Sequence, residues 1–133
     1  MSEANVAVVK QALDAFNRRD LDAYDDLYTP DFEWVPAMAG IVEGGGYKGR
    51  KGMATFLAEV RDTWEEFSVL TDEFRDIGGR VLVLCRIEGR GRGSGVQVDA
   101  PGGMVFEFRA GKMSRGHGYL GYGEALRAAG LTE

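Results

Sequence analysis

The chain has 133 residues, a net charge of −5, a hydrophobic fraction of 44%, one cysteine and one histidine. This length predicts a single domain over residues 1–133, and the ordinary hydrophobic fraction argues against intrinsic disorder. The acidic balance argues against nucleic acid as a partner, because nucleic acid binds to basic faces. No apolar run approaches the roughly 20 residues that span a bilayer, and a lone cysteine is typical of a reduced compartment. We therefore expect a cytoplasmic protein with no membrane partner.

The first part of the chain is predicted to form a helical corner. Apolar residues three and four apart indicate a helix over Glu3–Arg18 and a second, with Asp20 as its N-cap, over Leu21–Tyr28. A short strand is expected over residues 32–35, ended by Pro36. We expect this corner to close one side of a cavity.

Residues 37–52 are rich in glycine and predict an irregular loop, which either covers the cavity as a lid or is a surface excursion with no role. A continuous apolar stripe then predicts a third helix over Met53–Phe67. Such a stripe usually packs on a sheet, and Trp64 is the member of the stripe expected to touch a ligand.

From Ser68 onward the sequence alternates as β-strands do. The predicted strands cover residues 69–77, 80–88, 96–109 and 112–120. Gly78-Gly79 fits a two-residue hairpin turn, residues 89–95 fit a second turn, and Pro101-Gly102-Gly103 is expected to form a β-bulge. A closing helix over residues 124–129 is predicted to end at Gly130.

Helices followed by an antiparallel meander predict an α+β domain with helices on one face of a curved sheet. The strand over residues 80–88 begins with apolar residues on both faces, so both faces are expected to be covered. A partner subunit is the obvious cover for the second face, which predicts a homodimer through the sheet.

Three segments carry a resemblance to a known family: FNRRDLDAYDDLYTPDFEW, GYKGRKGMATFLAEV and FRAGKMSRGHGYLGYGEALRAAGL. Over about residues 6–131 the chain resembles the SnoaL-like branch of the nuclear transport factor 2-like superfamily, which includes ketosteroid isomerases and polyketide cyclases. The resemblance implies a cone-shaped α+β fold. In that fold, three helices from the N-terminal half pack on a strongly curved, mainly antiparallel sheet that encloses a pocket, and a short C-terminal helix follows.

The family's catalytic residues do not carry over. The ketosteroid isomerase tyrosine falls near Ala12 or Leu13, its aspartate base near Pro36 and its oxyanion acid near Met104. Cyclases of the family use an aspartate on the last strands, whereas residues 112–120 contain no acid. Epoxide hydrolases of the fold need an Asp-Arg-Asp set, for which a second acid is missing. The resemblance predicts the fold and leaves the reaction open.

Three polar residues are the remaining catalytic candidates: Arg86, Glu88 and His117. Arg86 and Glu88 share one strand face, as a charged pair either inside the pocket or at its mouth or a dimer edge. His117, the only histidine, suits acid/base chemistry at neutral pH. Strand alternation puts it on the face of Met113 and Arg115, and the family register suggests that the opposite, glycine-bearing face lines the pocket.

The candidates for lining a mostly apolar pocket are Trp34, Met38, Tyr47, Phe56, Trp64, Gln97, Met104 and Phe106. We expect no cofactor, and one histidine argues against a zinc centre. Two functions stay open. The chain either binds a small apolar molecule and acts on it by cofactor-free acid/base chemistry, or is a ligand-binding or interaction module without turnover.

Overall fold

The computed structural model describes residues 2–37 and 46–131. Its elements are α1 (Ser2–Asn17), the 3₁₀ helix η1 (Leu21–Tyr24), β1 (Tyr28–Val35), β2 (Tyr47–Lys48), α2 (Gly49–Thr63), β3 (Trp64–Ile77), β4 (Arg80–Gly91), β5 (Gln97–Arg109), β6 (Lys112–Leu120) and α3 (Tyr122–Ala128). The strands form one sheet in the order β2-β1-β6-β5-β4-β3, and among these described strands only the β1–β6 pair is parallel. The α+β prediction is confirmed. No helix within the described ranges is long and apolar enough to cross a membrane.

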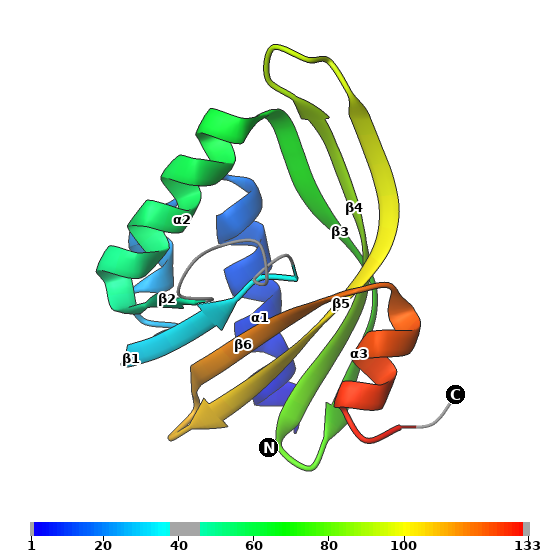
Figure 1. The fold of residues 1–133 in the computed structure, drawn as a ribbon. Helices are drawn as coiled ribbons and strands as arrows, with labels where there is room; N and C mark the ends of the chain where they lie inside the picture. Colours follow the sequence, from blue (N-terminus) through cyan, green and yellow to red (C-terminus); the bar gives the residue numbers. More distant parts are fainter. Residues whose placement is uncertain (1, 38–45, 132–133) are drawn as a thin grey trace.

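Helices cover both sides of the bent sheet (Figure 1). The first two, α1 and α2, lie in its concave side, and α3 lies against its convex side. The concave core joins both helices to the sheet, while a second core packs Leu82, Leu84 and Val105 against α3 residues such as Ala125. The chain's own C-terminal helix therefore supplies a second layer over this part of the convex face, where the sequence pattern pointed to a partner subunit.

The corner between α1 and the sheet is tighter than predicted. Asp20 is the N-cap, as expected, and its Oδ1 accepts a hydrogen bond from the Ala23 N–H at 3.3 Å. The helix that follows is one turn of 3₁₀ and ends at Tyr24, so the prediction of a helix to Tyr28 was wrong. The helix ends early because the chain pairs with β6. The Met113 N–H donates to the Leu27 carbonyl at 2.9 Å, and this bond holds the backbone after Tyr24 in an extended conformation.

Two side chains fasten the end of α1 to β3. The Asn17 amide donates to the Val69 carbonyl and accepts from the Val69 N–H, both at 2.9 Å. Because β3 is an edge strand, Asn17 takes the place of a neighbouring strand there. Arg19, in the left-handed region at φ 57°, donates to the carbonyls of Phe16 and Phe67 at 2.6 Å each.

The third predicted helix is displaced along the chain. It was expected over Met53–Phe67, but α2 begins at Gly49, ends at Thr63, and leaves Trp64 in β3. The two glycines in its first turn permit close packing rather than marking a loop. A Cβ on Gly49 would lie 2.9 Å from the Pro30 carbonyl oxygen, and one on Gly52 would lie 2.8 Å from the Tyr47 backbone. Only residues without a Cβ fit there.

The bulge expected at Pro101-Gly102-Gly103 does not form, because the β4–β5 ladder runs without a register shift. Pro101 lies beyond the end of β6, which pairs Leu120 with Gly102, so its missing N–H costs no ladder bond. The hairpin turn at Gly78-Gly79 is confirmed. The second turn is shorter than predicted, because β4 continues to Gly91.

Candidate ligand-binding site

The concave face of the sheet is apolar along three strands. Cross-strand pairs and core contacts assign alternate residues to this face: Val81, Val83, Cys85 and Ile87 of β4, Gly102, Met104 and Phe106 of β5, and Gly116 and Gly118 of β6. None of these positions carries a charge. A molecule held between helices and sheet would therefore meet hydrocarbon and aromatic surface along these strands.

A connected set of rings lies over this face. The aromatic cluster consists of Phe16, Trp34, Tyr47, Phe56, Trp64, Phe67 and Phe106. Phe56 of α2 is its centre, with ring centroids 6.0 Å from Trp34 and 5.1 Å from Tyr47. Trp34 stacks on Phe106 at 6.1 Å and 14°. Contacts through Phe16 and Phe67 extend the cluster to Trp64. Offset and edge contacts of this kind also suit a flat aromatic guest.

The burial of side chains differs between the two ends of the concave face. Val81 and Val83 are 0% exposed, whereas Ile87, further along the same face of β4, is only half-buried. Trp64 is half-buried as well, and Leu120, which pairs with concave Gly102, is 58% exposed. Apolar side chains that remain partly exposed on an inward face mark the mouth of the candidate site.

Glycines of β6 let the rings lie flat on the sheet. A Cβ on Gly116 would lie 2.7 Å from Phe106 Cε1 and 2.9 Å from Trp34 Cε3, and one on Gly118 would lie 3.4 Å from Trp34 Cη2. The glycine-bearing face of β6 therefore points toward the helices, as the family register suggested. Its opposite face carries His117.

Arg86 and Glu88 lie on the convex face. Arg86 alternates with concave Cys85 and Ile87, and its guanidinium pairs with Asp99 at 2.5 and 3.1 Å. Glu88 has Asp99 as its cross-strand neighbour. Gln97, predicted to line the pocket, is exposed at the far end of the same hairpin. This set is separate from the aromatic cluster.

His117 also lies on the convex face, beside Val105 and stacked on Tyr119 with ring centroids 4.4 Å apart. Its Nδ1 is 2.9 Å from the Gly118 carbonyl oxygen. Met113, expected on the same face, is instead buried in the concave core, because a register shift interrupts the alternation between Met113 and Arg115. Roles for Arg86, Glu88 and His117 in acid/base chemistry stay predictions, and they would require a substrate on the convex face.

The structure brings together most of the predicted lining residues. A chain of ring contacts joins Tyr47 to Phe56, Phe56 to Trp34 and Trp34 to Phe106, and Met104 lies in the same core. Trp64 joins through Phe67, which sequence reasoning placed in a helix. Met38 lies outside the described residues. The roles of these residues in ligand binding stay predictions.

Sequence reasoning also missed the packing role of Gly116 and Gly118. The alternating glycines of RGHGY were the available signal for a strand face kept free of side chains.

Two buried polar atoms have no hydrogen-bond partner among the described residues: the Tyr28 hydroxyl and Trp34 Nε1. Burial, with a contribution from the Asp25 carboxylate, raises the pKa of Tyr28. The Tyr47 hydroxyl differs, because it donates to Glu59; burial and this bond raise the pKa of Tyr47 to about 12. Tyr28 and Tyr47 are therefore neutral donors at physiological pH.

Cys85 gives the concave face a pH-dependent group. Its side chain is 0% exposed, and burial raises the pKa of the thiol from 9.0 to about 11, with a further contribution from Asp72. The unfolded chain therefore loses this proton first, between about pH 9 and 11. We expect the free energy of unfolding to fall across that interval because of this thiol, and not below it. Urea titrations at pH 7 to 10.5 test this, with Cys85→Ala as control; equal pH slopes in the two proteins would contradict it.

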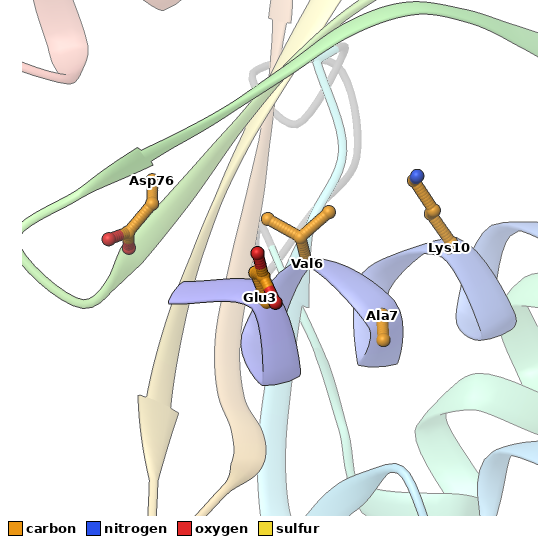
Figure 2. Close-up of a pocket in the computed structure, with 5 residues that line it drawn as sticks. All are labelled: Glu3, Val6, Ala7, Lys10 and Asp76. Carbon is orange, nitrogen blue, oxygen red and sulfur yellow. The ribbon is translucent and has the colours of Figure 1, made fainter. Parts of the chain in front are cut away.

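Two surface hollows lie elsewhere among the described residues. The larger, about 330 Å³, lies at the seam of α1 and β3 (Figure 2) and is bounded by Glu3, Val6, Ala7, Lys10 and Asp76. A second, about 200 Å³, lies between η1 and α2, with Arg19 and Arg61 at its edges. The first is mixed in charge, and its Lys10 ammonium lies 5.2 Å from the Phe74 ring centroid. Neither contains a member of the aromatic cluster.

Comparison with known proteins identifies the class. The SnoaL-like domain profile matches residues 9–116, so the chain belongs to the SnoaL-like family. No curated protein matches the chain. TerC, crystallised with polyporic acid, is a similar solved structure, with 26% identity, a TM-score of 0.78, and coverage of 88% of this chain and 91% of TerC.

Two further structures share the fold. An NTF2-like protein of unknown function from Burkholderia pseudomallei has 24% identity and a TM-score of 0.79, covering 93% of this chain and 95% of its own. A protein with a ketosteroid isomerase-like fold from Catenulispora acidiphila, in complex with trimethylamine, has 18% identity and a TM-score of 0.73, covering 93% and 92%. The cone-shaped fold implied by the sequence is therefore confirmed.

Proposed function

We propose that this SnoaL-like protein binds a small, flat and mostly apolar molecule between α2 and the concave face of the sheet. The observation that carries the proposal is the aromatic cluster, in which Phe16 and Phe106 are buried and the other rings are partly exposed. Ring faces and hydrocarbon bind flat apolar guests through area burial and stacking. The co-crystallisation of the similar protein TerC with polyporic acid supports a small-molecule role.

The geometry favours binding over acid/base turnover in the cone. General acid/base catalysis needs an ionisable group within hydrogen-bond reach of the reacting atom. The three ionisable candidates, Arg86, Glu88 and His117, alternate with the concave positions and lie on the other face. Binding is thus the function proposed for the cone. The predicted homodimer would use the convex face, and a light-scattering mass near 14.5 kDa would contradict it.

The test is a thermal-shift screen of polyporic acid and neutral flat aromatic compounds, followed by calorimetry on Gly116→Ala. The added methyl would lie within 2.9 Å of Phe106 and Trp34 ring atoms, so both rings must move from the proposed contact surface. We expect a loss of affinity of about tenfold and of stability of about 1–3 kcal/mol.

The control variant is Gly123→Ala on α3, whose added Cβ meets only the Arg127 guanidinium at 3.5 Å. It should bind as the unmodified chain does. The proposal fails if no compound raises the melting temperature, or if Gly116→Ala binds every hit with unchanged affinity.

A further inference from the structure

The indole N–H of Trp34 is a buried donor without an acceptor among the described residues. Removing such a donor from water without a new partner costs free energy, and nearly all buried polar groups in native proteins are paired. The Tyr47 hydroxyl, on the strand residue paired with Trp34, is already engaged with Glu59. The described residues therefore supply no acceptor for Trp34, and a bound molecule between helices and sheet can supply one.

The orientation of the indole is fixed by its contacts. Its six-membered ring lies against β6, with Cε3 and Cη2 nearest to the Cβ positions of Gly116 and Gly118. Nε1 is on the opposite edge of the indole from Cε3, and the N–H lies in the plane of the ring. Phe106 stacks on the ring and Phe56 meets it edge-on, at centroid distances of 6.1 and 6.0 Å. The donor is thus held at a defined place within the aromatic cluster.

The surroundings restrict the charge of the molecule that supplies the acceptor. The concave positions of β4, β5 and β6 are apolar or glycine, so these strands offer no charge to pair with a buried carboxylate or ammonium. Two charged groups, Arg19 and Glu59, contact the aromatic cluster, and both are engaged. The Arg19 guanidinium, 4.7 Å from the Phe16 ring centroid, donates to backbone carbonyls, and Glu59 accepts from the Tyr47 hydroxyl. Burying an unpaired charge is far more costly than burying a neutral polar group. A neutral oxygen, such as that of a ketone or ether, meets both requirements.

We propose that the ligand of the cone is a neutral flat aromatic molecule with an acceptor oxygen that receives the hydrogen bond of Trp34 Nε1–H. This inference rests on the proposed binding function and names the chemical class that the site selects. Trp34 is then the polar anchor, and the other rings of the cluster supply contact area. Compounds of equal shape are distinguished by whether they carry the oxygen.

The experiment uses 9-fluorenone and fluorene, which share a ring system and differ in the ketone oxygen. The chain has two tryptophans, so a ¹H–¹⁵N spectrum shows two indole N–H signals, assigned with Trp64→Phe. We expect fluorenone to move the indole N–H signal of Trp34 downfield, because the ketone oxygen accepts its hydrogen bond, and fluorene not to cause this shift. The Trp64 signal serves as a control for ring contact without a hydrogen bond. The measurement uses the unmodified chain and so does not depend on the stability of a variant.

Affinities give a second readout. Trp34→Phe keeps a ring and removes the donor, so it should lower affinity for fluorenone about three- to tenfold more than it lowers affinity for fluorene. Fluorene-9-carboxylate, which adds a charge to the same rings, should bind at least about tenfold more weakly than fluorenone.

The outcomes separate the two proposals. If both probes bind equally and the Trp34 signal does not distinguish them, the anchor is wrong and the binding function stands. If the carboxylate binds as well as the ketone, the neutral class is wrong. If neither probe binds while another compound of the screen does, the proposed ligand class is wrong and the binding function stands. If no compound of the screen binds, both proposals are overturned.

Discussion

Replacing Gly103 by alanine is expected to loosen α3 from the sheet and lower the free energy of unfolding by about 2–4 kcal/mol. A Cβ at this position would lie 2.3 Å from Ala125 Cβ and 3.2 Å from the Val83 carbonyl oxygen. Both neighbours are fixed by backbone, so α3 must move outward. Leu82 and Val105, which are 0% and 7% exposed, would then lose part of their cover.

The chain supplies a matched control and a rescue. Gly102→Ala changes the adjacent residue on the concave face, where the nearest atom to the new Cβ is at an ordinary 3.4 Å, so a small change is expected. Adding Ala125→Gly to Gly103→Ala removes the clashing methyl, although glycine in a helix itself costs about 1 kcal/mol. Urea unfolding followed by circular dichroism should show partial recovery in the double variant. Additive losses would mean that the two positions do not touch.

The elements that sequence reasoning predicted well are those whose periodicity had one interpretation. The helix expected over Glu3–Arg18 is α1 (Ser2–Asn17), and the strand expected over residues 112–120 is β6. The spacing of apolar residues set the limits of the helix, and turn residues set those of the strand. Alternation also divided β4 correctly into two faces.

The predictions that were wrong share a cause. Each relied on a local sequence pattern, and tertiary packing determined a different structure. Trp64 and Phe67 continue the helical spacing of α2, yet pairing of β3 with β4 extends through both residues and holds them in a strand. Gly49 and Gly103 were interpreted as loop and bulge residues, but each permits another element to approach closely. Gly49 and Gly103 lack the alternation that marks Gly116 and Gly118, so the sequence around them does not distinguish a turn glycine from a packing glycine.

The candidate site was predicted only in part. Aromatic residues could be proposed as lining because large apolar side chains gather in the interior of an α+β fold. The faces of β4 could be separated but not assigned, because both begin with apolar residues. The position of α3 decides the assignment: it covers Leu82 and Leu84, which puts Arg86 and Glu88 on its side of the sheet.

Asn17→Ala is expected to lower the free energy of unfolding by about 2–4 kcal/mol and to expose the free edge of β3. The substitution removes two hydrogen bonds at once and leaves the Val69 N–H and carbonyl without partners at a largely buried residue that is 7% exposed. Asn17→Asp keeps the acceptor but sets a carboxylate against the Val69 carbonyl, so it should also be destabilised. Hydrogen exchange of the Val69 amide should accelerate in Asn17→Ala.

The control for Asn17 is Asn5, on the same helix. Its amide makes one exposed hydrogen bond, to the Gly79 carbonyl at 3.0 Å, so Asn5→Ala should change stability by no more than about 0.5 kcal/mol. Equal losses in the two variants would show that Asn17 contributes only an ordinary surface contact. We expect the larger loss in free energy of unfolding for Asn17→Ala, with faster hydrogen exchange at Val69. That result would show that the Asn17 side chain replaces a neighbouring strand and so helps to hold α1 over the aromatic cluster.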